Sequence, residues 1–289
     1  MKNVLVVFNY NAGRRKATIY KKTIHKFLLE RCNKFKFIAV EELEDTNLDE
    51  YDTIFAVGGD GTVNKVATKA AKAGKNLALI PSGTANLLAN KLGIPNDLKN
   101  ALKVVDKNCV KKIDYIDING KECYLRCGFG YDCDIVCKTP QTLKNRFGYL
   151  SYLFAGIIFA FRLQPRMYEI NYDGKTMNVE ATCLIVANAA NMYQNMSSIA
   201  QKSQPDDGLA DIFVLKAKNP FTFISEFFRI LFGVTKDSGY ALYFTAQNLS
   251  IKNNWAVCHI DGEKTKLKDD INISVRPKVL SVYYNDSNK

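Results

Sequence analysis

The sequence predicts two domains, an N-terminal α/β domain and a β-rich domain that follows it. Over roughly the first hundred residues, apolar strand-like runs alternate with helical patterns, as they do in parallel sheets with helices on both faces. Beyond about residue 110 the pattern changes to short strand-like runs with a turn signal about every ten residues, which is typical of β-sandwiches. The length of 289 residues is ample for two hydrophobic cores. We expect the domains to span residues 1–118 and 119–289.

The first domain is expected to contain a buried parallel sheet. Continuous apolar runs predict strands at 4–8, 35–40, 53–57 and 76–80. Helical patterns predict helices from the polar turn at 9–16 to about residue 30, and at 62–73, 87–92 and 97–105. Gly74 follows the second of these helices in the usual position of a C-terminal cap.

The second domain is expected to consist mainly of short strands. Asn119-Gly120, placed between two apolar runs, predicts a β-hairpin. Helices are expected at about 141–163, after Pro140, and near 220–233. The remaining apolar runs predict strands at 167–172, 177–189, 209–216, 240–251, 255–260 and 270–284. The end of the last run, 279–284, could instead return to the first domain.

A glycine-rich loop joins the third predicted strand of the first domain to its helix. Gly58, Gly59 and Gly61 let the backbone approach a ligand closely. The helix that follows presents unpaired N–H groups and the positive end of its dipole, which favour an anion such as phosphate. Asp60 suits such a loop if a divalent cation accompanies the phosphate. The alternative is a tight strand-to-helix turn in which Asp60 caps a helix.

Two further loops leave predicted strands and enter helices, at residues 9–16 and 82–86. Like the loop at 58–62, both carry glycine together with hydroxyl, amide or basic side chains. In open α/β sheets, ligands bind beyond the C-terminal ends of the strands. Three such loops at one edge of the sheet favour a nucleotide site over three unrelated turns.

The formal net charge of +11 indicates an anionic partner, such as a nucleotide, a nucleic acid or an acidic membrane surface. The basic residues are mostly scattered, whereas a nucleic-acid footprint is usually clustered and interleaved with aromatic residues. We therefore expect no nucleic-acid partner. The longest uncharged apolar run, Phe147–Phe161, reaches only about 23 Å as a helix, short of the roughly 30 Å hydrocarbon core. No membrane span and no signal peptide are expected, and the expected compartment is the cytoplasm.

Several familiar catalytic and metal-binding patterns are missing. No P-loop, nucleophile elbow or His-Glu-x-x-His pair is present, and His25 and His259 are interpreted as surface or packed rings. The four cysteines between Cys123 and Cys137 lie in strand-like apolar sequence and lack the Cys-x-x-Cys pairs of structural zinc sites. Reduced, partly buried thiols are expected there rather than zinc.

Acidic side chains provide the remaining candidates. Asp261-Gly262-Glu263 follows a predicted strand, so its carboxylates either project from the strand end or belong to an ordinary Asp-Gly turn. The turn that contains Asp207 either closes a loop or holds a hard cation. Asp114 lies in an alternating strand near the expected domain junction.

Taken together, these segments resemble the diacylglycerol kinase catalytic family, which includes bacterial lipid kinases, diacylglycerol kinases and sphingosine kinases. The strongest matches are the segments 58–64 and 81–86. Four shorter motifs follow in the family's order: Lys112-Ile-Asp114, Gly128-Phe-Gly130, Asp206-Asp-Gly-Leu209 and Asp261-Gly-Glu263. The segment 139–148 is similar to soluble bacterial diacylglycerol kinases in particular.

The resemblance implies an α/β domain like that of NAD kinase and phosphofructokinase, followed by a β-sandwich that carries the lipid site. It implies ATP in the interdomain cleft, with Asp60 engaging Mg²⁺ and the phosphates. By analogy, Glu263 takes the proton from the lipid hydroxyl, and Asp114 supports the same site. Asp207 and the carbonyl groups of Gln204 and Leu209 match a structural metal position. The expected nucleotide-binding residues are Asn9, Gly58, Gly59, Asp60, Gly61, Thr62, Asn64, Ser82, Gly83, Thr84 and Asn86.

The resemblance leaves the substrate open. Diacylglycerol, phosphorylated to phosphatidate, is the simplest expectation, and a long-chain base or a ceramide-like lipid is the alternative. A catalytically silent nucleotide- or lipid-binding module is the third interpretation, because Leu87 stands where many relatives have Asp. Relatives also carry a glycine run where this chain has Asn191–Met196. The lipid would be reached at an anionic membrane surface by a peripheral protein on the inner face, and a homodimer is left open.

Overall fold

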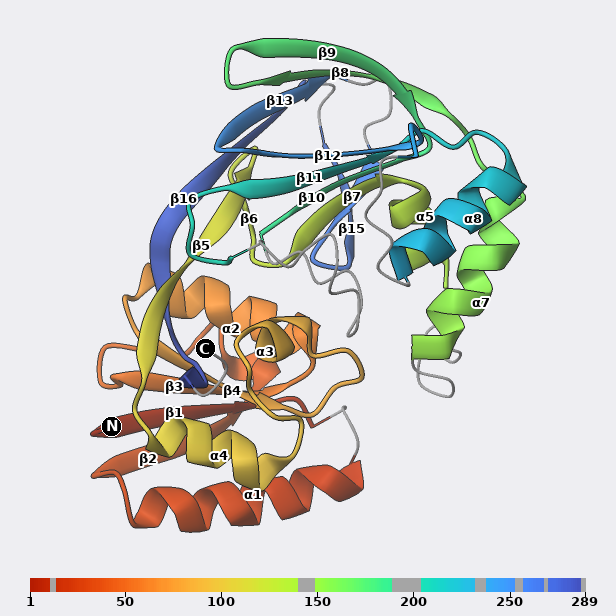
Figure 1. Cartoon of the computed structure of the whole chain (residues 1–289). Helices are drawn as coiled ribbons and strands as arrows, with labels where there is room; N and C mark the ends of the chain where they lie inside the picture. Colours follow the sequence, from red (N-terminus) through yellow and green to blue (C-terminus); the bar gives the residue numbers. More distant parts are fainter. Residues whose placement is uncertain are drawn as a thin grey trace. The chain divides into compact units, whose positions relative to one another are not determined.

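A computed structural model describes residues 1–10, 14–139, 149–188, 204–231, 238–252, 257–267 and 270–286. The chain divides into two units (Figure 1). The first unit comprises Met1–Ile113 and Lys278–Lys289, and the second comprises Asp114–Pro277. The division falls inside a strand, at residue 113, instead of after residue 118, because β5 (Val110–Ile118) begins in one unit and continues into the other. The segments 140–148 and 191–196, which entered the family comparison above, lie outside the described residues.

The first unit is built on a parallel sheet. Its strands are β1 (Asn3–Phe8), β2 (Lys34–Ala39), β3 (Thr53–Gly58) and β4 (Asn76–Pro81), in the order β2-β1-β3-β4. The C-terminal end of β16 (Asp270–Tyr283) is added beside β4, where Val282 pairs with Leu77 in parallel. Every residue of β3 is buried, as expected of a parallel strand covered on both faces. The α/β class predicted from the alternating pattern is confirmed.

Helices cover both faces of this sheet. They are α1 (Arg14–Leu29), α2 (Asp60–Lys72), α3 (Leu87–Lys91) and α4 (Leu98–Asp106), and a short 3₁₀ turn spans Val40–Glu42. Figure 1 shows α2 and α3 on one face of the sheet and α1 and α4 on the other. The side chain of Asp97 caps α4 by accepting a hydrogen bond from the backbone N–H of Asn100 at 2.9 Å.

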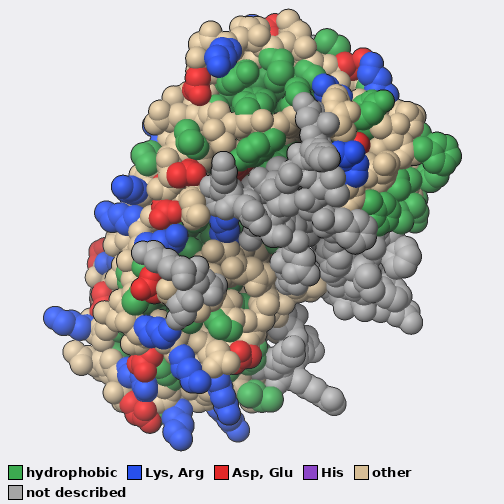
Figure 2. Space-filling model, viewed as in Figure 1, with side chains coloured by type: hydrophobic (Ala, Val, Ile, Leu, Met, Phe, Trp, Pro, Cys, Tyr) green, Lys and Arg blue, Asp and Glu red, His purple; other side chains and the backbone are tan. Residues whose placement is uncertain are grey.

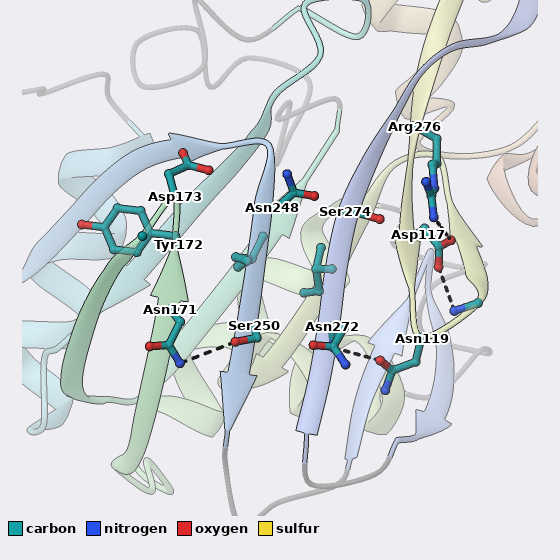
Figure 3. Close-up of a pocket in the computed structure, with 14 residues that line it drawn as sticks. Asp117, Asn119, Asn171, Tyr172, Asp173, Asn248, Ser250, Asn272, Ser274 and Arg276 are labelled. Carbon is teal, nitrogen blue, oxygen red and sulfur yellow. Dashed lines mark hydrogen bonds and ion pairs between the residues drawn. The ribbon is translucent and has the colours of Figure 1, made fainter.

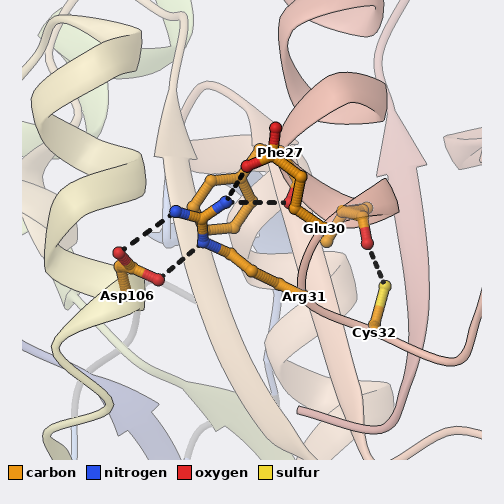
Figure 4. Close-up of polar contacts among 6 residues, drawn as sticks. Phe27, Glu30, Arg31, Cys32 and Asp106 are labelled. Atoms are coloured by element: carbon orange, nitrogen blue, oxygen red, sulfur yellow. Dashed lines mark hydrogen bonds and ion pairs between the residues drawn. The ribbon is translucent and has the colours of Figure 1, made fainter.

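A polar contact joins the ends of α1 and α4 (Figure 4). Arg31, which follows α1, donates from Nε to Oδ1 of Asp106 at 2.7 Å. Its guanidinium also lies over the ring of Phe27, with 4.3 Å between Cζ and the ring centroid. Both charged groups remain partly exposed to solvent, so this contact orients the helix ends more than it stabilises the unit.

The second unit contains two packed antiparallel layers. One has the strand order β12-β11-β10-β7-β14-β15, and the other has the order β16-β13-β8-β9, with β5 paired to β16 and β6 paired to β5. Apolar residues from both layers, such as Phe129, Tyr168 and Leu184, form one buried cluster, which confirms the predicted β-sandwich. The bounds of the strands not yet given are β6 Lys121–Cys123, β7 Arg126–Gly130, β8 Arg166–Tyr172, β9 Lys175–Ala181, β10 Cys183–Ala187, β11 Ala210–Leu215, β12 Ala241–Ala246, β13 Asn248–Lys252, β14 Val257–Ile260 and β15 Glu263–Lys266.

Three helices belong to the second unit: α5 (Tyr131–Lys138), α7 (Tyr149–Ala160) and α8 (Pro220–Leu231). The helix α5 was not expected, because its sequence was interpreted as strand-like. Tyr131 and Ile135, one helical turn apart, are both buried in a cluster with residues of α7 and α8. The helix expected at 141–163 is present as α7, and its first part lies outside the described residues.

Two apolar runs that were each predicted as one strand are divided in the structure. The run at 177–189 separates into β9 and β10 at Thr182, whose hydroxyl oxygen lies 3.0 Å from each of the carbonyl oxygens of Leu215 and Ala217, both within reach of its single proton. The run at 240–251 separates into β12 and β13, which lie in different layers of the sandwich. Neither run contains a glycine or proline that would mark the change of sheet, although β9 is partly exposed and β10 is fully buried.

The described residues contain no metal site formed by three or more His, Cys, Asp or Glu side chains. None of the eight cysteines forms a disulfide bond in the structure. Cys133 and Cys137 lie on α5 rather than on a strand, with 3.8 Å between their sulfur atoms. No helix in the part of the chain that the structure describes is both long and apolar enough to span a bilayer.

Candidate active site

The glycine-rich loop of the first unit is packed closely against a second loop. β3 ends at Gly58, and Gly59 is the N-cap of α2 and makes no side-chain cap hydrogen bond. A Cβ atom built on Gly83 would lie 2.5 Å from Cα of Gly59. A Cβ atom on Gly58 would lie 2.4 Å from Cβ of Thr62. The glycines therefore allow two strand-end loops to meet without side chains between them.

This contact can be tested with a matched pair of substitutions. Gly83→Ala is expected to lower the free energy of unfolding by about 1–3 kcal/mol, because the added methyl group displaces the backbone of Gly59. Gly61→Ala is the control, since a Cβ atom there meets no atom within 4 Å. Urea unfolding of both variants measures the effect. Equal stability of the two variants would contradict the assigned contact.

The amide side chains near these loops have defined partners. Asn9 donates from Nδ2 to Oγ1 of Thr62 at 3.1 Å. Asn86 has a positive φ of 48° and is bound to Gly83 in both directions, at 3.1 Å from Oδ1 to N and 3.1 Å from Nδ2 to O. Both residues therefore shape the loops. Oδ1 of Asn64 is buried and has no hydrogen-bond partner among the described residues.

Asp60 caps a helix, but a different one from the helix that it begins. Its Oδ1 atom accepts a hydrogen bond from the backbone N–H of Leu87 at 2.7 Å, at the first residue of α3. The alternative interpretation made Asp60 the cap in its own strand-to-helix turn, whereas Gly59 is the N-cap of α2 and the Asp60 bond connects two loops that are 27 residues apart in the sequence. This contact involves one carboxylate oxygen of Asp60. It does not test whether Asp60 binds a metal, which stays a prediction.

The Asp-Gly-Glu turn of the second unit connects β14 to β15. Asp261 and Gly262 both have positive φ, 48° and 91°, as in a type I′ hairpin turn. The carboxylate of Asp261 is buried, which raises its pKa, and hydrogen bonds from neighbouring donors oppose this shift. Its donors are the backbone N–H groups of Tyr124, Leu125 and Arg126 at 2.8, 2.9 and 2.9 Å, and Sγ of Cys123 at 3.2 Å.

Glu263 differs from Asp261 in its surroundings. It is the first residue of β15, and its side chain is exposed. Asp261 is bound by backbone donors and fixes the turn, so the accessible carboxylate of the motif is Glu263. The residue pattern alone did not make this division, since both carboxylates were expected either to project from the strand end or to form an ordinary turn, and only the family resemblance singled out Glu263.

Asp114 is fully buried and holds a neighbouring turn in place. Its Oδ2 atom accepts from the backbone N–H of Gly208 at 2.7 Å, and its own N–H donates to the carbonyl of Pro205 at 2.7 Å. Its carbonyl oxygen accepts from Nδ2 of Asn188 at 2.7 Å. These contacts favour the supporting role that the resemblance implied over direct contact with a substrate.

The predicted structural metal position lies in this turn. Gln204, Asp207 and Leu209 are exposed, and Oδ1 of Asp207 accepts from the backbone N–H of Leu209 at 2.9 Å. One carboxylate and two carbonyl groups are oxygen donors of the kind that Mg²⁺ and Ca²⁺ accept. The donor set therefore suits a hard cation in its chemistry, and the ligand assignment remains a prediction.

A polar pocket of about 580 Å³ lies elsewhere in the second unit (Figure 3). It is formed by neighbouring strands and turns and contains none of the predicted site residues. Asn171 and Ser250 contact each other across it at 3.5 Å, and Arg276 pairs with Asp117 at 3.4 Å. The lining positions alternate with core residues along β13 and β16, so their sequence pattern is that of an ordinary solvent-facing strand.

Sequence reasoning missed a buried hydrogen-bonded pair beside the Asp-Gly-Glu turn. Nε2 of His259 lies 2.6 Å from Oδ2 of Asp132, and both residues are almost completely buried. His259 was interpreted only as a surface or packed ring, and Asp132 was not singled out. The two residues are 127 positions apart, and the only local signal was the position of Asp132 just after the Gly128-Phe-Gly130 motif.

Comparison with known proteins supports the interpretation of both units. The model of the diacylglycerol kinase catalytic domain matches residues 3–118, and that of the YegS C-terminal NAD kinase beta sandwich-like domain matches residues 126–284. A diacylglycerol kinase of Bacillus subtilis is 28% identical over 277 residues, which are 91% of this chain and 90% of that protein. A crystal structure of a diacylglycerol kinase from Bacillus anthracis superposes with a TM-score of 0.80 at 23% identity, covering 99% of this chain and 98% of that one.

Other relatives have different names or lengths. An uncharacterized protein of Synechocystis is 31% identical over 214 residues, so the match covers 74% of this chain but only 47% of that protein. A protein of Klebsiella pneumoniae named as a probable lipid kinase of the YegS-like type is 34% identical over 151 residues, covering 51% of this chain and 50% of that protein. The second family model alone covers more than half of the chain, and the first covers most of the remainder. The chain therefore belongs to the diacylglycerol kinase catalytic family, with a catalytic α/β domain followed by a YegS-type β-sandwich.

Proposed function

We propose that this protein is an ATP- and Mg²⁺-dependent lipid kinase that phosphorylates the hydroxyl group of diacylglycerol to give phosphatidate. The observation that carries the proposal is the Asp-Gly-Glu turn, in which buried donors fix Asp261 and leave Glu263 as an exposed carboxylate. Family membership and the glycine loops of the first unit support the same function.

The first unit is proposed to bind the nucleotide. The α2 N-terminus has no side-chain cap, so its N–H groups are suited to phosphate oxygens. Gly61 leaves open space beside this end of the helix, and Asp60 supplies a carboxylate for Mg²⁺. When bound, Mg²⁺ would neutralise charge on the phosphates. Asn9, Thr62 and Asn86 act indirectly in this proposal, because their described contacts hold the loops in shape.

The second unit is proposed to activate the lipid hydroxyl. As the hydroxyl oxygen forms its bond to the terminal phosphorus of ATP, the bond from phosphorus to the bridging oxygen breaks and ADP leaves. The hydroxyl proton goes to the carboxylate of Glu263, which is accessible to solvent and requires no rearrangement of a buried bond. Asp114 keeps the turn at 205–208 in place and is not assigned a proton.

A panel of lipids tests the substrate assignment. In mixed micelles with ATP and Mg²⁺, we expect phosphate transfer to diacylglycerol to exceed transfer to sphingosine or ceramide. Transfer to sphingosine or ceramide but not to diacylglycerol would replace the proposed substrate with the alternative one. ATP binding without any lipid-dependent transfer would identify a silent binding module, the interpretation that Leu87 favours.

An apolar surface formed by the end of α7 and the start of α8 supports contact with a membrane. Ile158, Phe161 and Phe221 are 61%, 61% and 76% exposed, and the two phenylalanine rings lie 6.4 Å apart. Figure 2 shows hydrophobic side chains gathered over these helices. Arg162, which follows Phe161 in the chain, and Lys218, two residues before α8, are also exposed, and Lys218 pairs with Glu180. Exposed aromatic and aliphatic side chains flanked by basic residues are suited to the interface of an anionic bilayer.

Phe161→Ser combined with Phe221→Ser is expected to weaken binding to vesicles of phosphatidylcholine and phosphatidylglycerol at least about tenfold. Each phenylalanine would otherwise bury an apolar side chain worth about 1.5–3 kcal/mol when fully removed from water. Activity on a water-soluble short-chain diacylglycerol is expected to be unchanged. Ile19→Ser, which removes a 63% exposed apolar side chain from the first unit, is the control for vesicle co-sedimentation. Equal losses in both variants would contradict this docking surface.

A further inference from the structure

A buried polar cluster lies directly beneath the Asp-Gly-Glu turn. His259 on β14 is 1% exposed and Asp132 on α5 is 4% exposed. Nε2 of His259 lies 2.6 Å from Oδ2 of Asp132, whose Oδ1 atom is 3.3 Å from Nη2 of Arg126 on β7. Three separate elements of the second unit therefore bring one ring, one carboxylate and one guanidinium together away from solvent.

The fold leaves space for this pair at a glycine. A Cβ atom built on Gly128 of β7 would lie 2.0 Å from Oδ2 of Asp132 and 2.5 Å from Nε2 of His259. The φ angle of Gly128 is not positive, so the backbone conformation does not require glycine at this position. The requirement comes from the buried pair, which occupies the volume that any side chain at position 128 would need.

The hydrogen bonds assign the tautomer of His259. The backbone N–H of Gly262, the central residue of the Asp-Gly-Glu turn, donates to Nδ1 of His259 at 3.3 Å. Nδ1 must therefore be an acceptor, so the proton of the neutral ring is on Nε2 and is donated to Asp132. Burial alone would raise the pKa of Asp132, but Arg126 and His259 lower it, in keeping with an anionic acceptor.

We propose that His259 is a positioning residue for Glu263. Its ring joins the fixed carboxylate of Asp132 to the backbone N–H of Gly262, the residue immediately before Glu263. This inference rests on the proposed function, because it assigns Glu263 as the group that takes the hydroxyl proton. The carboxylate of Asp261 and the ring of His259 each bind the turn through hydrogen bonds. The two contacts together restrict the position of the turn that carries the accessible carboxylate of Glu263.

Two substitutions separate positioning from simple packing. Glutamine at position 259 can place a donor near the position of Nε2 and keep Asp132 bonded, but it loses the Nδ1 acceptor for Gly262. Asparagine can place an acceptor near Nδ1 but leaves Asp132 without its histidine donor. We expect His259→Gln to remain about as stable as the wild type while kcat falls about tenfold and KM for ATP is unchanged. We expect His259→Asn to be less stable but to retain more of kcat per folded molecule.

The measurements are urea unfolding, kcat and KM for each variant, and ¹⁵N NMR of the histidine rings. The chain contains only two histidines, so the His259→Gln spectrum assigns the remaining signal to His25. A wild-type His259 signal with an unprotonated Nδ1 at neutral pH supports the assigned tautomer. A protonated Nδ1, or a stable His259→Gln variant with wild-type kcat, overturns the proposal. If the wild-type chain transfers no phosphate to lipid, the proposed function fails instead, and the NMR result still reports on the tautomer.

Discussion

Glu263→Gln is expected to lower kcat for phosphate transfer to lipid at least about a hundredfold, the usual scale of general acid–base catalysis. Glutamine has nearly the same shape as glutamate but cannot accept the hydroxyl proton. Because Glu263 is exposed and its side chain is not part of the buried Asp261 network, the free energy of unfolding should remain close to that of the wild type. The variant should also bind ATP normally, because Glu263 lies in the second unit.

The control for this substitution is Asp173→Asn. Asp173 is also an exposed carboxylate at a hairpin turn of the second unit, and its positive φ of 45° is readily adopted by asparagine. Its removal should leave both kcat and KM unchanged. Near-normal turnover of Glu263→Gln under conditions in which Asp173→Asn is also normal would exclude Glu263 as the base.

Asp60→Asn is also expected to lower kcat for phosphate transfer at least about a hundredfold. The cause in this variant is weaker binding of Mg²⁺, and the proton acceptor Glu263 is unchanged. Asparagine retains an oxygen that can accept the N–H of Leu87, so the contact between the two loops should persist. It removes the negative charge that is proposed to hold Mg²⁺, so more Mg²⁺ should be needed for half-maximal activity. A titration of activity against Mg²⁺ measures this change.

Asp60→Ala separates the cap from the charge. Alanine removes both the hydrogen bond to the N–H of Leu87 and the negative charge proposed to hold Mg²⁺. The free energy of unfolding of this variant should therefore fall by about 0.5–2 kcal/mol relative to the wild type, as for other lost helix caps. Asp60→Asn should keep that stability. If Asp60→Asn has wild-type activity and Mg²⁺ dependence, then Asp60 serves only as the cap of α3, and the proposed metal role is wrong.

Much of the fold could be predicted because its signals are local. The continuous apolar runs of the first unit identified its four N-terminal strands to within a residue or two, and Asn119-Gly120 identified the β5–β6 hairpin. The helix α5 and the separation of β9 from β10 were missed. Periodicity alone does not distinguish a helix from a strand in a segment as short as α5, and the change from the partly exposed β9 to the fully buried β10 has no glycine or proline to mark it.

The candidate site was predicted only as a set of motifs. The sequence indicated which loops and turns to consider, but the roles of individual carboxylates depend on contacts between distant segments. Asp261 is satisfied by backbone donors about 136 residues away, and Asp60 by an N–H 27 residues away. No local pattern contains that information. His259 and Asp132 are also far apart in the sequence, which explains why their pairing was not anticipated.

The central claim is that this chain transfers phosphate from ATP to the hydroxyl group of a lipid. The most direct measurement is the formation of radiolabelled phosphatidate from γ-labelled ATP and diacylglycerol in mixed micelles, by the purified chain, with Mg²⁺ and with EDTA. We predict labelled phosphatidate with Mg²⁺, and none with EDTA or with Glu263→Gln. The absence of labelled lipid in a wild-type sample that binds ATP and Mg²⁺, across diacylglycerol, ceramide and sphingosine, would contradict the account.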